Sequence, residues 1–466
     1  MEIKVLDSVK DVSCEVLVIN KFEGEKTSQE LANTYAVEKD GFEGKFGQTY
    51  LLHTLGKSSA DKILIVGFGK KEDFDANKMR LAVSKAVKKL QQIYAKNACF
   101  DFDVNCDYGK SAAIGAMIAD YAFDKYKTEK AARVSEITFA KFSEKDVKEG
   151  IVFGEAMKFA RDLANEPAEF ATPSKLAEIA SNLDGITAKI YDKEEIERMG
   201  MGAYLAVGKG SAQPPKFIHM KYSGKNPKKK IAIIGKGICF DSGGLDIKPA
   251  SSMLTMRDDM SGAACVLGVM RALSSLEPDV EVHGIIAACE NMPSGTSYKP
   301  GDILRAKNGK TIEVDNTDAE GRLTLADALC YACELGVDEV IDIATLTGAC
   351  VVALGTGVSG IMGNDEDLIS TLIRTAGDSG EKFWELPLFP EYKDSLKSDI
   401  ADMKNTGSRQ GGASIAGVFL KEFVNGPKWA HIDIAGTAFL EKPQKEFISG
   451  STGAGVRTLL NYIKIS

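Results

Sequence analysis

The chain has 466 residues, enough for two or three domains with hydrophobic cores of their own. Hydrophobic residues make up 44% and charged residues 27% of it, as in an ordinary soluble globular protein. The formal net charge of −8 at pH 7 argues against a general affinity for nucleic acid or for an anionic membrane.

The sequence patterns do not favour secretion or membrane insertion. The first 20 residues mix acidic and apolar side chains and lack the apolar core and cleavage site of a secretory signal. A charge-free stretch at 343–364 is rich in glycine and threonine, which favours a buried, turn-rich segment over a membrane helix. Nine scattered cysteines, among them Cys330 and Cys333, are interpreted as buried reduced thiols. These features predict a cytoplasmic protein without a membrane partner.

The first part of the chain alternates strand-like and helix-like patterns. Apolar runs and helical spacing predict strands over 15–20 and 62–69, a helix over 79–94, a strand over 98–104, a helix over 111–123 and a strand over 136–142. This alternation favours an α/β domain with a mainly parallel sheet. Gly67 and Gly69 resemble a phosphate-binding loop, but a strand-ending turn is preferred because the full G-x-G-x-x-G pattern is missing.

A long helical pattern follows, and it ends before Pro167 because the residue before a proline resists the helical conformation. Beyond it the patterns predict a helix over 173–183, a strand over 186–192, a helix over 194–200, and strands over 203–210, 217–222 and 229–235. We therefore expect a small N-terminal α/β domain over 1–142, a linker helix over 143–165, and a larger C-terminal α/β domain over 166–466 with a central mixed sheet.

Three segments of the second region, 235–249, 256–264 and 316–323, carry a candidate metal site. The strand ending at Gly235 would place Lys236 and Asp241 in the following loop, at the sheet edge where α/β proteins collect binding sites. Asp259 directly precedes a helical pattern over 261–276. A carboxylate there is also favoured by the free N–H groups of a helix start, so its position alone does not indicate a metal.

Asp318 and Glu320 follow a predicted strand over 311–316. Residues two apart in an extended segment point to one side, so both carboxylates can meet one cation; two solvated carboxylates are the alternative. Gathering them with Asp241 and Asp259 would cost on the order of several kcal/mol without cations, and two divalent ions would offset that cost. Lys236 would join as a neutral amine, or else form a salt bridge with a carboxylate.

None of the four histidines lies in these segments, so oxygen atoms would supply most of the ligands. His431 lies in an apolar, strand-like run beside Trp429, and we interpret it as a hydrogen-bonded core residue. The carboxylate-rich pattern by itself is compatible with hydrolysis of a peptide or of a phosphoester by two metals.

The segments resemble the leucyl (cytosol) aminopeptidase family of metallopeptidases, of which NTDAEGRL (316–323) is the signature. Further motifs fit in order: ARDLANEPAEFATP (160–173), VGKGS (207–211), IATLTGAC (343–350), SDIADMKNTG (398–407), WAHIDIAGTA (429–438) and TGAGVRTLL (452–460). The match covers the region after residue 150, whereas the first 140 residues are similar only in their α/β alternation. Asp246, Ser261 and Glu169 depart from the commonest pattern, which affects the expected substrate preference, and Asp246 is close to Lys248 in sequence.

The resemblance implies a set of site residues. The ligands of two divalent ions, manganese or zinc, would be Lys236, Asp241, Asp259, Asp318 and Glu320, with Asp241 and Glu320 bridging the ions. The catalytic pair would be Lys248 and Arg322, with a bicarbonate ion held by Arg322 to shuttle a proton. The pocket for the first side chain of the substrate would be lined by Met256, Thr345 and Gly348.

The expected activity is metal-dependent release of N-terminal amino acids from peptides, with a leucine-like preference, by a homohexamer. A phosphoester hydrolase would explain the carboxylates but not the order of the motifs. A nucleotide- or DNA-binding role would suit the N-terminal alternation, and some relatives bind DNA. The net charge of −8 and the lack of a basic stripe argue against it, so DNA binding is not expected.

Overall fold

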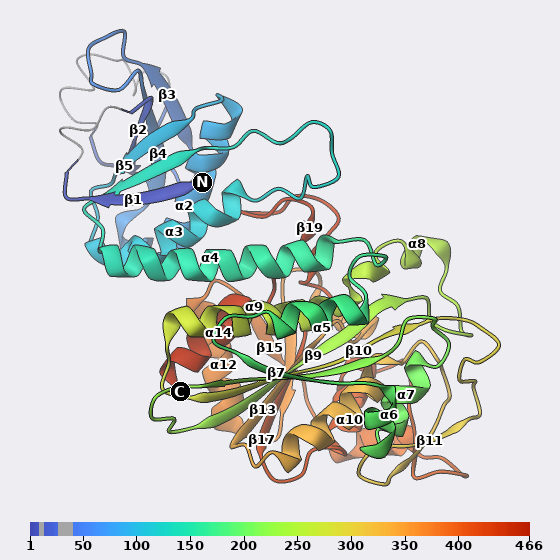
Figure 1. Ribbon diagram of the computed structural model, residues 1–466. Helices are drawn as coiled ribbons and strands as arrows, with labels where there is room; N and C mark the ends of the chain where they lie inside the picture. The colour runs from blue at the N-terminus through green and yellow to red at the C-terminus, as the bar shows by residue number, and fades with distance from the viewer. Residues whose placement is uncertain (9–13, 27–40) are drawn as a thin grey trace. The chain divides into compact units, whose positions relative to one another are not determined.

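The computed structural model describes residues 1–8, 14–26 and 41–466. They form two compact units, one of Met1–Lys158 with Lys442–Ile448 and the other of Phe159–Glu441 with Ser449–Ser466 (Figure 1). Near its C-terminal end, the chain thus leaves the second unit to contribute a short segment to the first. In the described part of the chain, no helix combines the length and apolar character that crossing a bilayer requires.

The first unit is built on a six-stranded sheet in the order β1-β6-β5-β2-β4-β3, in which β3 is antiparallel to β4 and the other pairs are parallel. The strands are β1 (Glu2–Leu6), β2 (Val16–Phe22), β3 (Thr49–His53), β4 (Lys62–Gly69), β5 (Asn97–Asp101) and β6 (Glu136–Ala140). The helices are α2 (Ala76–Gln92), α3 (Gly109–Asp120) and the first part of α4 (Glu144–Asn165). The mainly parallel α/β fold is as predicted. The two strands that the sequence did not reveal, β1 and β3, are the sheet edges, where few apolar side chains are buried.

Two details of this unit bear on function. Gly67 and Gly69 lie in β4, which ends at Gly69, and their N–H groups donate to the carbonyl groups of Gln48 and Gly44. A Cβ atom on Gly67 would lie 2.2 Å from the Lys45 carbonyl oxygen, so this glycine allows a close backbone approach within the strand, and the predicted strand-ending turn is confined to Gly69. The segment Lys442–Ile448 is attached through Glu446, whose carboxylate lies 3.1 Å from Arg80 Nε with both side chains buried.

The second unit is built on an eight-stranded mixed sheet in the order β15-β14-β17-β13-β9-β10-β8-β7. Its strands are β7 (Thr187–Tyr191), β8 (Lys216–Ser223), β9 (Lys230–Asp241), β10 (Glu281–Asn291), β13 (Glu339–Ala344), β14 (Ser359–Gly363), β15 (Phe383–Glu385) and β17 (Lys428–Asp433). Short strands form two small sheets: β11 (Ile303–Arg305), β12 (Thr311–Glu313) and β16 (Met403–Lys404) in one, and β18 (Phe439–Leu440) and β19 (Gly450–Ser451) in the other. The predicted α/β fold with a central mixed sheet is confirmed.

Helices cover both faces of this sheet (Figure 1). They are α5 (Pro173–Ser181), α6 (Lys193–Arg198), α7 (Gly202–Gly208), α8 (Ala250–Met253), α9 (Ser261–Leu276), α10 (Gly321–Glu334), α11 (Gly348–Leu354), α12 (Glu366–Asp378), α13 (Gly412–Lys421) and α14 (Val456–Ile465). Helices α9, α12 and α14 pack together on one face, and α7, α10 and α13 pack on the other. The start of α9 and the start of α10 therefore approach β9 from opposite faces.

The predicted strand over 203–210 is wrong, because these residues form helix α7. Its buried Val207 lies three positions after Tyr204 and four after Ala203, both also buried, and this face packs against α10. The Tyr204 N–H donates to the carboxylate of Asp327 in α10 at 2.9 Å, which fixes the helix start. A short apolar run between glycines fits either element by its pattern alone, and the tertiary packing decided it.

Candidate functional site

Strand β9 carries two of the predicted site residues. Lys236 and Asp241 lie within the strand, so the prediction that they follow its end at Gly235 is wrong. The strand leaves β13 at Gly235 but stays paired with β10 as far as Asp241, which is opposite Asn291 beyond a bulge. At Gly235 helix α9 packs closely, because a Cβ atom there would lie 2.4 Å from the carbonyl oxygen of Gly262. The glycine thus marks a close backbone approach.

Three carboxylates from three elements meet at this strand. Asp241 comes from β9, Asp259 from the 3₁₀ turn Met256–Met260 that leads into α9, and Glu320 from the residue before α10. All three are buried, and one oxygen of each lies within 4.8 Å of the others. Lys236 Nζ lies 2.7 Å from Asp259 Oδ1 and 2.9 Å from Glu320 Oε1, and it donates to the carbonyl oxygen of Thr345 at 3.0 Å. Four of the five predicted ligands thus form one buried cluster.

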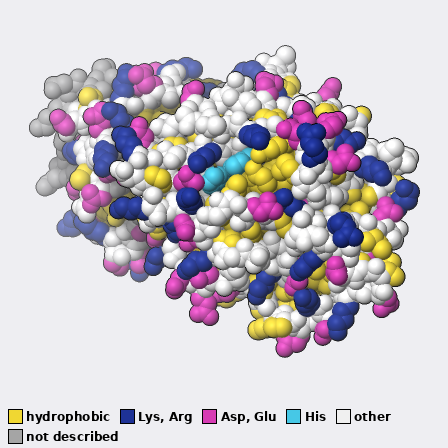
Figure 2. All heavy atoms as spheres, turned by 60° about the horizontal axis from the view of Figure 1, so that its bottom comes forward, with side chains coloured by type: hydrophobic (Ala, Val, Ile, Leu, Met, Phe, Trp, Pro, Cys, Tyr) yellow, Lys and Arg dark blue, Asp and Glu magenta, His cyan; other side chains and the backbone are white. Residues whose placement is uncertain are grey.

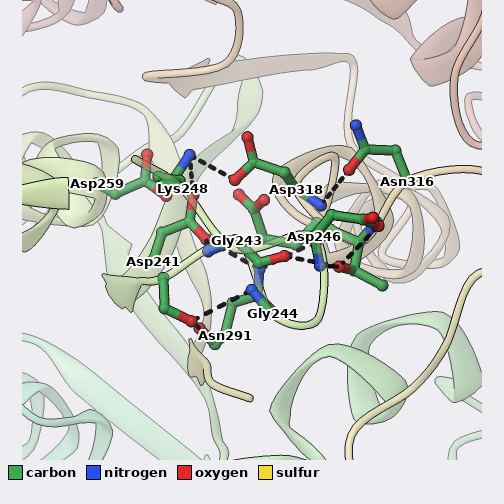
Figure 3. Close-up of polar contacts among 12 residues, drawn as sticks. Asp241, Gly243, Gly244, Asp246, Lys248, Asp259, Asn291, Asn316 and Asp318 are labelled. Atoms are coloured by element: carbon green, nitrogen blue, oxygen red, sulfur yellow. Dashed lines mark hydrogen bonds and ion pairs between the residues drawn. The ribbon is translucent and has the colours of Figure 1, made fainter. Parts of the chain in front are cut away.

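Asp318 and Lys248 lie beside this cluster. Lys248 Nζ lies 2.8 Å from Asp241 Oδ2 and 2.6 Å from Asp318 Oδ1 (Figure 3). The predicted extended geometry of residues 318–320 is wrong, since β12 ends at Glu313 and a turn follows. In this turn Asn316 Oδ1 accepts a hydrogen bond from the Asp318 N–H at 2.7 Å. Asp318 and Glu320 consequently contact different lysines.

The electrostatics of the cluster reflect buried charges of both signs. Burial raises the pKa of the Asp259 and Glu320 carboxyl groups, and the nearby carboxylate of Asp241 raises it further. Burial alone would lower the pKa of Lys236 and of Lys248, but the surrounding carboxylates outweigh it and hold both values above the ordinary one. Lys236 therefore forms salt bridges with Asp259 and Glu320, which was the predicted alternative to its binding a metal as a neutral amine.

The donor set nevertheless fits divalent cations. Asp259 Oδ2 and Glu320 Oε2 are buried, and no group in the described ranges donates a hydrogen bond to either oxygen. A buried acceptor without a partner costs on the order of 1–3 kcal/mol, so two of them in one cluster call for a ligand. Carboxylate oxygens suit manganese, and zinc accepts them as well. A Cβ atom on Gly321 would lie 2.7 Å from Lys236 Nζ, so the glycine of the signature leaves room for the lysine.

Arg322 lies in the first turn of α10, half-buried beside Phe419. Its Nη1 donates to the carbonyl oxygen of Asn405 at 2.9 Å. Burial lowers the pKa of its guanidinium to about 10. One N–H of the fork is thus used to hold the segment that contains Asn405.

Two of the three predicted pocket residues lie at the carboxylate cluster or begin the turn that leads to it. Thr345 is at the cluster, because its Oγ1 lies 2.7 Å from Asp259 Oδ1, and Met256 begins the turn that carries Asp259. Gly348 lines a cavity of about 630 Å³, and neither Met256 nor Thr345 is among the residues that line it. The other walls of this cavity are α11, Leu386 and residues 409–414.

One buried residue of the site, Asn291, was not predicted from the sequence. It ends β10, and its Nδ2 donates to Asp241 Oδ1 at 2.9 Å and to the carbonyl oxygen of Thr317 at 3.0 Å (Figure 3). The signal was a pair of polar residues, Glu290 and Asn291, directly after the apolar run 284–289 at the carboxyl end of a strand next to β9. By contrast, the prediction for His431 is confirmed: it is fully buried, with Nδ1 at 2.5 Å from Asp342 Oδ1.

The chain is similar to known proteins over most of its length. The chain matches the model of the cytosol aminopeptidase family catalytic domain over residues 158–460 and that of the N-terminal domain of the same family over residues 20–130. A probable cytosol aminopeptidase of Aquifex aeolicus is 47% identical over 440 residues, covering 91% of this chain and 89% of that protein. One of Alkaliphilus oremlandii is 41% identical and covers 100% of this chain and 99% of that protein.

Two solved structures are also similar. The bottromycin maturation enzyme BotP in complex with Mn has a TM-score of 0.91 at 32% identity and covers 97% of this chain and 99% of its own. A mutant of tomato leucine aminopeptidase has a TM-score of 0.90 at 34% identity and covers 100% of this chain and 97% of its own. The family models, the similar sequences and the similar structures all indicate one family. The chain belongs to the cytosol aminopeptidase family, the members of which are peptidases that hydrolyse peptides from the N-terminus.

Proposed function

We propose that this aminopeptidase uses two divalent metal ions, manganese or zinc, held by Lys236, Asp241, Asp259, Asp318 and Glu320, with Asp241 and Glu320 between the two ions. The observation that carries the proposal is the pair of buried, unsatisfied oxygens, Asp259 Oδ2 and Glu320 Oε2, in a cluster of converging carboxylates. Bound ions supply Lewis acidity and a water that loses its proton readily. The relative BotP is known in complex with Mn, which supports the choice of metal.

The lysines then take different roles. Lys236 is buried between Asp259 and Glu320, and a cation there would replace its proton and leave a neutral amine as a ligand. Lys248 is at the rim of the cluster between Asp241 and Asp318, and it stays an ammonium ion at neutral pH. An ammonium group so placed stabilises the negative charge that develops on the carbonyl oxygen of the scissile bond.

Arg322 is proposed to hold bicarbonate as the proton carrier. No histidine lies in the three segments that form the cluster, so the chain itself offers no imidazole base there. The guanidinium keeps N–H groups beyond the one that Asn405 occupies, and a planar fork suits a carbonate oxygen pair.

The side-chain preference is proposed to be leucine-like. Met256 and Thr345 border the carboxylate cluster, and Gly348 leaves open space at the start of α11, since a Cβ atom there would meet nothing within 4 Å. The related tomato enzyme is named a leucine aminopeptidase. A homohexamer, a cytoplasmic location and the domain boundaries 1–142, 143–165 and 166–466 remain further proposals, the first of which sedimentation would test.

The experiment compares metal content and turnover in the same preparation. The full chain is loaded with Mn²⁺ or Zn²⁺, bound metal is counted by mass spectrometry, and hydrolysis of aminoacyl anilides is compared with that of an aryl phosphate. Two ions per chain and turnover of leucyl anilide are expected. Fewer than two ions in active enzyme would contradict the dinuclear site, and phosphate release alone would favour a phosphoester hydrolase.

DNA binding is not proposed. On the face shown in Figure 2, basic side chains are interspersed with acidic ones and form no continuous basic stripe. Together with the net charge of −8, this gives duplex DNA no extended positive surface on that face.

A further inference from the structure

Asp246 departs from the family pattern next to Lys248, and the structure shows what its carboxylate contacts. Asp246 Oδ2 accepts a hydrogen bond from the Thr317 N–H at 2.8 Å and lies 3.1 Å from Thr317 Oγ1. In return the Asp246 N–H donates to Thr317 Oγ1 at 2.9 Å (Figure 3). Lys248 forms its ion pairs with Asp241 and Asp318 instead. Asp246 and Thr317 thus form a closed hydrogen-bonded ring between two segments that are far apart in sequence.

The ring joins the two segments that carry the reacting groups. Asp246 lies in the loop 242–248, which ends at Lys248, and the Lys248 N–H closes this loop on the carbonyl oxygen of Ser242 at 2.9 Å. Thr317 directly precedes Asp318 and is fully buried, and its Oγ1 also donates to the carbonyl oxygen of Gly243 at 2.6 Å. The Thr317 side chain is therefore hydrogen-bonded to the backbone at both ends of the turn, at Gly243 and at Asp246.

The loop has little freedom to adjust in other ways. Gly243 and Gly244 have φ angles of +89° and +68°, and a Cβ atom on Gly243 would lie 2.4 Å from the Asp246 carbonyl oxygen. Lys248 itself has a flexible four-carbon side chain, so the position of its ammonium group depends on the position of the backbone at residue 248. A misplacement of about 1 Å at a reacting centre can cost about 10²-fold in rate.

We propose that Asp246 is a positioning residue for the aminopeptidase reaction. By accepting the hydrogen bond from the Thr317 N–H it fixes the loop that carries Lys248 against the turn that carries Asp318. Its effect depends on the position of its acceptor oxygen, which the length of the side chain sets, and not on its negative charge. The inference rests on the proposed role of Lys248 at the scissile carbonyl.

The chain offers a matched control elsewhere. Asp402 Oδ2 accepts from the Thr311 N–H at 2.7 Å and lies 2.9 Å from Thr311 Oγ1, and the Asp402 N–H donates to Thr311 Oγ1 at 3.0 Å. This second ring has the same bonds and also involves an exposed aspartate, but it ties the residue before β16 to the start of β12. Removing it tests what the loss of such a ring does to the fold alone.

The test uses full-length, metal-loaded enzyme with leucyl anilide and measures kcat, KM, bound metal and Tm. Asp246→Asn keeps an acceptor oxygen without the charge, and we expect kcat within about threefold of the parent. Asp246→Glu keeps the charge but moves the carboxylate by one methylene, and Asp246→Ala removes it. For both we expect kcat to fall about 10-fold or more with KM and metal content nearly unchanged. Asp402→Ala should keep the parent kcat.

A double-mutant cycle with Lys248→Ala separates positioning from stability. If Asp246 acts through Lys248, Asp246→Glu costs nothing further in that background. The proposal is overturned if Asp246→Asn is as slow as Asp246→Glu, if Asp246→Glu has the parent kcat, if the two losses multiply, or if Asp402→Ala lowers kcat equally. A parent enzyme that is inactive on every aminoacyl anilide would instead refute the proposed function, whereas parent activity with unaffected variants refutes only the role of Asp246.

Discussion

Lys236 Nζ lies 2.7 Å from Asp259 Oδ1 although these residues come from a strand and from the turn before a helix that packs on it. The pair is buried, and the second oxygen of Asp259 is left without a hydrogen-bond donor in the described ranges of the chain. In an ordinary salt bridge the oxygens of the carboxylate are paired or solvated. Here Asp259 Oδ2 is buried without a partner among the described residues, and we therefore expect a bound cation to contact it.

Removal of metal should therefore lower stability as well as activity. A ligand present at about 100 times its Kd stabilises the folded state by about 2.7 kcal/mol. We expect chelation to lower Tm by several degrees and added Mn²⁺ or Zn²⁺ to restore it, measured by differential scanning fluorimetry. Glu320→Gln should lose most of this metal-dependent shift. A Tm that does not respond to metal would contradict the proposed site.

Lys248→Ala should separate catalysis from metal binding. The ammonium lies at the rim of the cluster, so its loss removes an oxyanion contact while the buried ligands stay in place. We expect kcat to fall by about 10² or more with unchanged metal content, on the scale of one such contact. Lys225→Ala, at an exposed lysine that is 3.7 Å from Glu277, serves as the control and should behave as the parent. Equal activity of the two variants would refute the role of Lys248.

The stability of the second unit should depend on pH through His219. Its Nε2 lies 2.8 Å from His283 Nδ1, and its Nδ1 lies 2.9 Å from the Tyr331 hydroxyl. Burial lowers the pKa of His219 to about 4, below its ordinary value of 6.5. The unfolded chain then binds the proton more tightly than the folded one, so stability is lost as the pH falls from 6.5 towards 4.

His219→Gln should therefore show a shallower decline of Tm than the parent between pH 6.5 and 4.5. His53→Gln provides the comparison, since His53 is exposed on the edge strand β3. Thermal melts across this range measure both variants. Parallel pH profiles for His219→Gln and the parent would count against the prediction.

Gly235→Ala should destabilise the protein through a backbone clash. The added Cβ atom would lie 2.4 Å from the Gly262 carbonyl oxygen, where α9 packs on β9, and neither element can move without disturbing Lys236. Overpacking of this kind costs about 1–3 kcal/mol. Gly377→Ala is the control, because its Cβ would meet nothing within 4 Å in helix α12, and alanine there should stabilise slightly. Denaturant melts distinguish the two; similar midpoints would disprove the clash.

Local patterns predicted the elements better than they predicted the geometry of the site. The strand at 229–235 and the helices after Asp259 and Glu320 are present, because their apolar residues repeat with the right period. The strand end at Gly235 was wrong because the reason for the glycine is the backbone of Gly262, which is 27 residues away in sequence and adjacent only in the fold. The residue pattern of a single strand gives no information about a neighbour that only the fold brings close.

The same reason explains the missed residue and the turn at Asp318. Asn291 matters because the parallel partner of its strand ends in Asp241, and only the register of the two strands reveals the contact. Residues 316–320 form a turn because the Asn316 side chain accepts from the Asp318 N–H, a local bond that competes with the extended conformation. Family resemblance named the candidate ligands, and the residues that hold them in place had to be found in three dimensions.

Because Lys442–Ile448 belongs to the first unit, neither unit is encoded by one continuous stretch of sequence. Between β18 and β19 of the second unit, the polypeptide contributes Glu446 to the interior of the first, opposite Arg80. A truncated chain that starts after residue 158 would keep this carboxylate and lose its guanidinium, so its loop would carry a charge without the partner that balances it. Exchange of N-terminal units between relatives therefore requires three junctions, one on each side of this loop and one within α4.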